Sequence, residues 1–128
     1  MPTLDLYHGA NAEKMLYNVM NGALTADSQG KIFFAERDWA SCLKHGTDMS
    51  TKESYVVKVT VDVPDSVRIE RTPVHGNADA LILHLEPGGK VSARFHEMYV
   101  RSGRVGSFLT TVIPGSAIQA HLMNAKGR

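Results

Sequence analysis

Apolar and polar residues alternate in several short segments of the chain, which is the pattern of half-buried β-strands. The clearest case is residues 55–63, where valine occupies every second position from 57 to 63. We expect further short strands over residues 4–7, 31–35, 67–69, 94–100, 108–113 and 116–119. The apolar run over residues 80–85 fits either a buried strand or a short helix.

Two segments in the first half have apolar residues at helical spacing instead. The first follows Asn11, a suitable N-cap, and stops before Gly22, which is suited to end a helix. The second is predicted over residues 35–43 and stops before Gly46. At the other end of the chain, we expect the tail from Asn124 onward to be frayed.

The order of these elements predicts the fold class. Helices precede most of the strands and do not alternate with them, which argues against a doubly wound parallel sheet. We therefore predict an α+β fold with two packed, mostly antiparallel β-sheets and two helices in the N-terminal half. The 128 residues contain no repeat and no linker-like stretch, so we expect one domain over residues 1–128.

Composition narrows the class of protein without naming a function. Hydrophobic and charged contents of 43% and 21% are ordinary for a soluble globular protein. A single cysteine excludes an internal disulfide, and the six histidines lack metal-site spacing, so we expect no metal. The N-terminus does not resemble a signal peptide, and no apolar run is long enough to span a membrane, so no membrane partner is expected.

Charge is distributed unevenly along the chain and isolates one carboxylate. From residue 87 onward there are six Lys and Arg against a single acid, Glu97, whereas the first 86 residues hold eight against twelve. Glu97 lies inside a run of strand-forming residues. Such a carboxylate either pairs with a neighbouring cation on a solvated strand or stabilises positive charge that develops on a substrate.

Three short motifs, each weak alone, occur in a fixed order. They are LYHGA at residues 6–10, GKIFFA at residues 30–35 with a serine at position 41, and FHEMYV at residues 95–100. Together they resemble the ADP-ribosyltransferase superfamily, in particular its His-Tyr-Glu branch, which includes diphtheria-like toxins and poly(ADP-ribose) polymerase catalytic domains. The resemblance implies a cleft between two antiparallel sheets that holds NAD.

The resemblance also implies a role for each motif residue. In the first motif, Tyr7, His8 and Gly9 would contact NAD. His8 would bind the adenosine ribose, and the backbone of Gly9 would bind the nicotinamide amide. Phe33 would lie against the nicotinamide ring, and the Ser41 hydroxyl would assist at the amide.

The family also has a second stacking tyrosine, three residues after the serine. Its position is occupied by Lys44 in this chain, so we expect Trp39, one helical turn earlier, to stack in its place.

Glu97 would contact the 2′-hydroxyl of the nicotinamide ribose, so the resemblance makes Glu97 and His8 the catalytic residues. Cleavage of the nicotinamide–ribose bond develops positive charge on the sugar, and a nearby carboxylate stabilises that charge and can orient an incoming hydroxyl. Phe33 and Ala10 depart from the tyrosine and the hydroxyl residue that are usual in the family. Phe95, two residues before Glu97, argues against the arginine-modifying branch, and we expect single transfer rather than polymer.

The acceptor is the least defined part of this hypothesis. The basic segment around Glu97 favours a nucleic acid, RNA in particular, over a protein. Resemblance to compact toxin and effector domains implies a cytoplasmic site of action, delivery as the C-terminal domain of a larger secreted protein, and an immunity protein that blocks the cleft. Three alternatives stay open: an NAD glycohydrolase, an RNA 2′-phosphotransferase of related fold, and a non-catalytic nucleic-acid- or protein-binding module.

Overall fold

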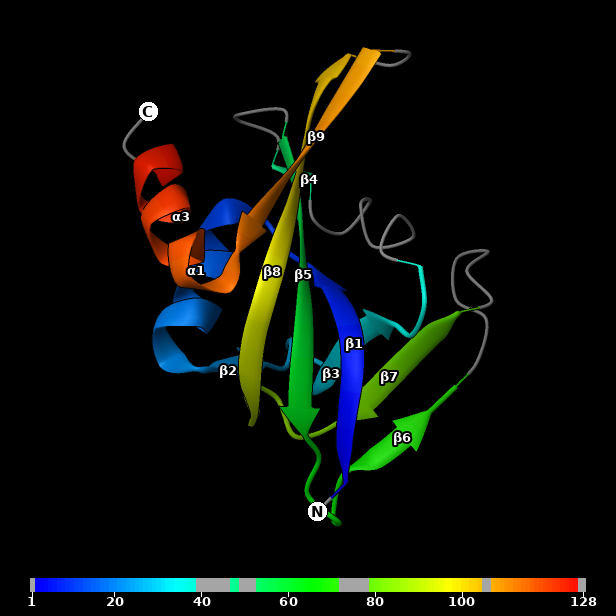
Figure 1. Ribbon diagram of the computed structural model, residues 1–128. Helices are drawn as coiled ribbons and strands as arrows, with labels where there is room; N and C mark the ends of the chain where they lie inside the picture. Colours follow the sequence, from blue (N-terminus) through cyan, green and yellow to red (C-terminus); the bar gives the residue numbers. More distant parts are fainter. Residues whose placement is uncertain (1, 39–46, 49–52, 72–78, 105–106, 127–128) are drawn as a thin grey trace.

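The structure is a computed structural model that describes residues 2–38, 47–48, 53–71, 79–104 and 107–126 of the 128-residue chain. It is a mixed α+β fold, as expected (Figure 1). In chain order the elements are β1 (Thr3–Gly9), α1 (Ala12–Asn21), β2 (Ala23–Thr25), β3 (Lys31–Ala35), β4 (Thr47–Asp48), β5 (Glu53–Asp62), β6 (Arg68–Glu70), β7 (Ala80–His84), β8 (Lys90–Arg104), β9 (Ser107–Pro114), the 3-10 turn η2 (Gly115–Ala117) and α3 (Ile118–Lys126).

The described strands form one sheet in the order β2-β8-β5-β1-β3-β7-β6, with β4 beside β5 and β9 beside β8. Every described pairing is antiparallel. β1 pairs with β5 along its whole length, but it meets β3 at a single register pair, Tyr7 with Ala35. The prediction of antiparallel pairing is confirmed, whereas the two separate packed sheets are corrected to one sheet that is joined sparsely between β1 and β3.

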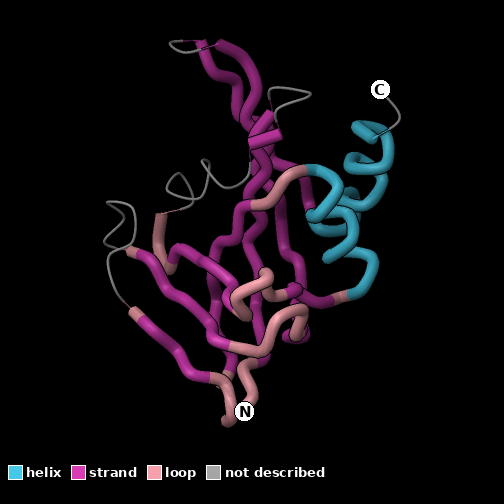
Figure 2. The backbone as a smooth tube through the Cα atoms, turned by 180° about the vertical axis from the view of Figure 1, so that it is seen from behind, coloured by secondary structure: helices cyan, strands magenta, loops and turns pink. Residues whose placement is uncertain are grey.

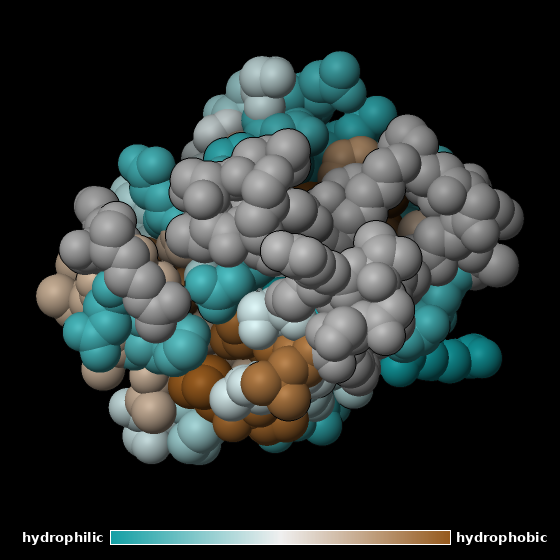
Figure 3. All heavy atoms as spheres, turned by 90° about the horizontal axis from the view of Figure 1, so that it is seen from above, coloured by the Kyte–Doolittle hydropathy of each residue, from teal (hydrophilic) through white to brown (hydrophobic). Residues whose placement is uncertain are grey.

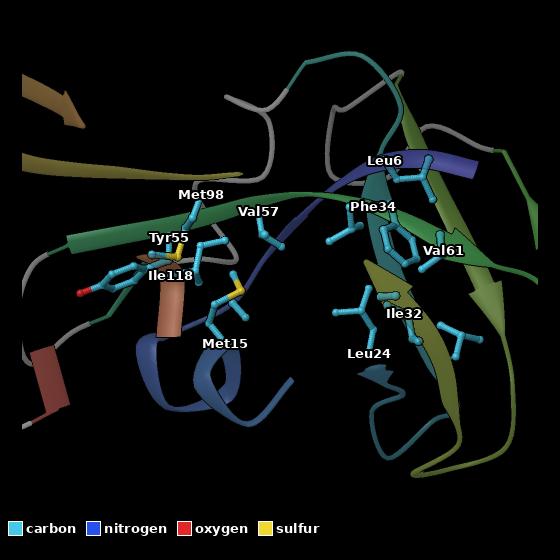
Figure 4. Packing of buried hydrophobic residues seen from close by; sticks show 14 of the residues in the cluster. Leu6, Met15, Leu24, Ile32, Phe34, Tyr55, Val57, Val61, Met98 and Ile118 are labelled. Carbon is cyan, nitrogen blue, oxygen red and sulfur yellow. The ribbon is translucent and has the colours of Figure 1, made fainter. Parts of the chain in front are cut away.

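Both described helices pack against each other and against the same face of the sheet (Figure 2). Met15 of α1 and Ile118 of α3 point toward Val57 of β5 and Met98 of β8 (Figure 4). All four side chains are 0% exposed, so the main core lies between the helix pair and the sheet. Burial of this apolar surface is the main force that holds the helices on the sheet.

Helix α1 has the ends that its sequence predicts. The Asn11 side chain accepts a hydrogen bond from the backbone N–H of Lys14 at 2.9 Å, which caps the first turn. At the other end Gly22 adopts φ 61°, a left-handed conformation that favours glycine, and its N–H bonds back to the carbonyls of Asn18 and Val19. These caps place the helix directly between β1 and β2.

The C-terminal segment differs from its prediction. Residues 116–119 were expected as a strand, yet they form the end of η2 and the start of α3. Ile118, Leu122 and Ala125 recur at helical spacing and are buried, so packing against α1 stabilises a helix there. The tail from Asn124, expected to be frayed, is helical as far as Lys126.

The second predicted helix of the N-terminal half is not seen in the described residues. Ala35 closes β3, and residues 36–38 form bends rather than a helical turn. The remainder of that prediction, residues 39–43, lies outside the described part of the chain. The ambiguous run is settled as strand β7, because Ala80–His84 pairs with both β3 and β6.

The β8–β9 ribbon extends beyond the rest of the sheet (Figure 1). Leu109 and Val112 of β9 are 67% and 54% exposed, and Met123 of α3 is 54% exposed. Figure 3 looks at this end of the molecule and shows hydrophobic side chains at the surface beside hydrophilic ones. Apolar side chains at this end therefore stay outside the core.

Candidate functional site

Strands β1, β5 and β8 present two faces with different chemistry. His8 pairs with Val57, which pairs with Met98, and these residues define the inner face. Tyr7 pairs with Lys58, which pairs with Glu97; we call this side the outer face. Directly paired residues project to the same side of a sheet, and successive residues project to opposite sides. The structure therefore does not bring together His8 and Glu97, the two predicted catalytic residues.

His8 is held in a fixed orientation on the inner face. Its Nδ1 atom lies 2.8 Å from the backbone carbonyl oxygen of Phe33, and its ring centroid lies 5.4 Å from that of Phe34. A carbonyl oxygen can only accept a hydrogen bond, so Nδ1 carries the proton. In the neutral ring, Nε2 is then an acceptor for a ligand hydroxyl.

A pocket of about 770 Å³ opens between the end of β1, the helix α1, the 25–27 segment and β3. Three of the predicted NAD-contacting residues, His8, Gly9 and Phe33, line it. Phe33 is half-buried whereas Phe34 is only 3% exposed, as the alternation of a strand requires. The pocket therefore collects residues from the first two motifs but not from the third.

The opposite wall of the pocket is polar. Asn18 of α1 lines it and is only 6% exposed. Thr25 lines it as well, and within the described residues its buried hydroxyl oxygen has no hydrogen-bond partner. A buried hydroxyl without a partner costs free energy, of the order of 1–3 kcal/mol, and a ligand that bonded to it would recover that cost.

Both signs of charge lie around the pocket. Lys14 and Lys31 line it, as do Glu13 and Asp27. One oxygen of Asp27, Oδ1, already accepts hydrogen bonds from two backbone N–H groups of its own turn, at Gln29 and Lys31. Glu13 is exposed in the first turn of α1.

Glu97 belongs to a separate cluster on the outer face. The hydroxyl of Tyr99 donates a hydrogen bond of 2.5 Å to its Oε1 atom. Burial of the phenol, together with this bond and the charge of Glu97, raises the pKa of Tyr99 well above its ordinary value. The ring of Tyr7 lies 6.2 Å from that of Tyr99, and both rings pack against buried Val56.

A β-bulge explains why two polar residues in succession face this side. Glu97 pairs with Lys58, whereas Phe95 pairs with the next residue, Val59, so His96 is the extra residue in β8. His96 consequently projects to the outer face beside Glu97, and its Nε2 atom lies 2.6 Å from the Thr60 hydroxyl.

A hydrogen-bonded chain fixes the imidazole of His96. The Thr60 hydroxyl donates to Oδ1 of Asp5 at 2.5 Å, and its oxygen is therefore free to accept a hydrogen bond from Nε2–H of His96. The outer face is thus an ordered polar cluster on three adjacent strands.

The predicted site residues consequently fall into three groups. His8, Gly9 and Phe33 line the pocket, whereas Tyr7 and Glu97 lie on the outer face. The other two predicted residues, Trp39 and Ser41, lie outside the described residues.

The motifs did not identify the polar wall of the pocket, which is formed by Asn18 and Thr25. Asn18 had a usable signal, because a polar residue three positions after Met15 interrupts the apolar stripe of α1. Thr25 had none, because only the return of the chain through β2 brings it to the pocket.

No metal centre is found in the part of the chain that the structure describes, since no three His, Cys, Asp or Glu side chains gather there. None of the described helices is long and apolar enough to cross a membrane.

Comparison with known proteins finds no matching family model, no matching curated protein and no matching solved structure. The resemblance to ADP-ribosyltransferases therefore rests on the motif residues of this chain, three of which line the pocket.

Proposed function

We propose that the protein is an NAD-consuming mono-ADP-ribosyltransferase whose NAD site is the pocket between β1, α1 and β3. One observation carries the proposal. His8, Gly9 and Phe33 were singled out by two separate motifs as NAD contacts, and all three line this one pocket. His8 and Gly9 end β1 and Phe33 lies on the neighbouring strand β3, so the pocket joins the first two motifs.

The lining of the pocket fits the chemical parts of NAD. Its volume of about 770 Å³ lies within the usual range for sites of small molecules and cofactors. Phe33 offers an aromatic surface for the nicotinamide ring, and Gly9 lets the backbone approach the amide closely. Nε2 of His8 would accept a hydrogen bond from a ribose hydroxyl, and the Thr25 hydroxyl and Asn18 amide would bind further polar groups.

The proposed reaction needs a carboxylate near the ribose, because breaking the nicotinamide bond leaves positive charge on the sugar. Glu97 projects from the outer face and is badly placed for that role. Among the carboxylates that line the pocket, Glu13 is exposed and Asp27 has one oxygen engaged in its own turn.

Asp79, which directly precedes β7, is not among the residues that line the pocket. Its Oδ2 atom accepts backbone N–H bonds from Arg37 and Asp38, which follow the end of β3. We therefore assign the stabilising role to a carboxylate on the pocket side of the fold and place Glu13 first.

Nicotinamide release from NAD tests this assignment directly. We expect His8→Ala and Phe33→Ala to lower the rate at least tenfold, because each removes a group that would contact NAD. His96→Ala is the matched control, since it removes an imidazole from the same sheet but from the outer face. Glu97→Gln should keep most of the activity, whereas Glu13→Gln and then Asp27→Asn should identify the carboxylate that the reaction needs.

Two results would change the conclusion. If Glu97→Gln abolished release while His8→Ala had no effect, the reacting centre would be the outer face and not the pocket. If the wild-type protein neither bound NAD in calorimetry nor released nicotinamide, the transferase proposal would be overturned. The fate of labelled ADP-ribose separates transfer from hydrolysis, because a hydrolase yields only the free product.

A further inference from the structure

An exposed tyrosine, Tyr17, lies at the mouth of the pocket and contacts a lysine from a distant part of the sequence. Tyr17 of α1 lines the pocket and is 50% exposed. The Nζ atom of Lys90, at the start of β8, donates a hydrogen bond of 3.1 Å to its hydroxyl and lies 5.2 Å from the ring centroid. This contact favours one orientation of the exposed ring over the other rotamers that it could adopt.

Tyr17 belongs to a stripe along one side of α1. Lys14 and Met20 lie three residues before and after it, so the three side chains are neighbours on the helix surface. All three line the pocket, and Met20 is 63% exposed. We call Lys14, Tyr17, Met20 and Lys90 the rim platform. It combines a flat, half-exposed aromatic ring with apolar surface and two ammonium groups.

The charge around the platform favours an anionic partner. Lys14, Lys31 and Lys90 supply three positive charges there. Against them stand Glu13 and Asp27, and Asp27 already directs one oxygen to the backbone of its own turn. The balance is positive, and the Lys90 ammonium lies at the hydroxyl end of the Tyr17 ring, 3.1 Å from the hydroxyl oxygen and 5.2 Å from the ring centroid.

We propose that the rim platform docks the acceptor, and that the acceptor is a single-stranded nucleic acid with one base stacked on Tyr17. This inference rests on the proposed transferase activity of the adjoining pocket. Aromatic rings flanked by cations are how proteins bind single strands, because every base has a face to stack and every linkage carries a phosphate. An acidic peptide would use the lysines but would gain nothing from the ring, and a duplex would keep its bases stacked inside.

The platform can be tested by fluorescence anisotropy with labelled single-stranded RNA and DNA, in the absence of NAD. We expect Tyr17→Ala to weaken binding about tenfold, since stacking contributes ~1–3 kcal/mol per base and 1.4 kcal/mol is a factor of ten. Lys90→Ala should weaken binding and lower the slope of log affinity against log salt by about 0.7. Tyr17→Phe, which keeps the ring but loses the bond to Lys90, should fall between wild type and Tyr17→Ala.

Arg68→Ala is the control, because it also removes one positive charge but from β6, outside the rim platform. The Arg68 side chain is 66% exposed. Unchanged affinity in Tyr17→Ala would overturn the platform, as would a wild-type preference for duplex or for poly-glutamate over the single strand. The thermal midpoint of each variant confirms that it is folded. Failure of this proposal is distinct from failure of the transferase. A protein that releases nicotinamide but does not bind the oligonucleotide refutes only the platform. A protein that binds the oligonucleotide but does not release nicotinamide refutes the reaction and, with it, the acceptor role of the platform, which is then a nucleic-acid site alone.

Discussion

Among the glycines for which the structure describes the surroundings, Gly30 combines a left-handed backbone with a close backbone contact for an added methyl group. Its φ of 80° is left-handed, and a Cβ built on it would lie 2.6 Å from the backbone oxygen of Leu85. The two backbones cannot easily separate, because the N–H of Leu85 donates to the Gly30 carbonyl at 2.6 Å. We expect Gly30→Ala to cost about 1–2 kcal/mol for the backbone conformation. The steric clash should add at least the ~1 kcal/mol of that hydrogen bond.

Urea denaturation measures this cost against an internal reference. Gly88 has a similar φ of 74°, but a Cβ there would meet nothing within 4 Å, so Gly88→Ala should lose only the conformational term. With an m-value of about 1.5 kcal/mol/M, Gly30→Ala should lower the midpoint by ~1.3–2 M and Gly88→Ala by ~0.7–1.3 M. Equal midpoints for the two variants would show that the Leu85 backbone yields to the methyl group, and the steric argument would be wrong. The comparison also reports on the pocket, because Gly30 directly precedes Lys31, which lines it.

Two further predictions concern the outer face and the core. The raised pKa of Tyr99 means that the unfolded chain ionises first, so its contribution to stability is fully present below about pH 10 and is lost as the pH rises further. The urea midpoint of wild type should therefore fall more steeply above pH 10 than that of Tyr99→Phe, and parallel curves would contradict the assignment. In the core, Met15→Ala should cost about 2–5 kcal/mol, because Met15 is 0% exposed. Met20→Ala, on the exposed side of the same helix, should stay within about 0.5 kcal/mol, and a similar loss in both would refute the packing of α1.

The elements that sequence predicts best are those with local signals at both ends. Helix α1 has Asn11 and Gly22 as caps, and both caps behave as their residue types require. Helix α3 has Ile118, Leu122 and Ala125 at helical spacing, but it lacks such end signals: no side chain caps the 3-10 turn that leads into it, and the Pro-Gly pair before it is typical of a turn. It is stabilised by contacts with α1, a hundred residues earlier in the chain, and such contacts are invisible to a local pattern.

The candidate site was predictable only in part, because it too depends on contacts between residues that a local pattern does not relate. His8, Gly9 and Phe33 were found because a motif records residue type and order along a strand end. Asn18 and Thr25 form the opposite wall, and their proximity depends on how α1 returns through β2 to the sheet. A motif carries no information about that return, so the polar wall required the three-dimensional structure.

The sequence of β8 nevertheless indicates which of its residues face the core and where that alternation shifts. Ala93 and Phe95 contribute to the core at odd positions, whereas Met98 and Val100 contribute at even positions. Alternation along a strand can change phase only where one extra residue is inserted. A bulge near residues 96–97 is therefore required if both pairs are buried, and the structure has it there.

The same reasoning about phase separates Glu97 from His8. Leu4 and Leu6 of β1 pack on the core, so His8, two residues further, must share their inner face. Glu97 directly precedes the buried Met98, so it must project to the outer face. A motif that lists His and Glu in order does not record the side of the sheet on which each projects. The carboxylate that the proposed reaction needs should consequently be sought among residues that reach the pocket side of the fold, and order along the chain alone cannot assign that role to Glu97.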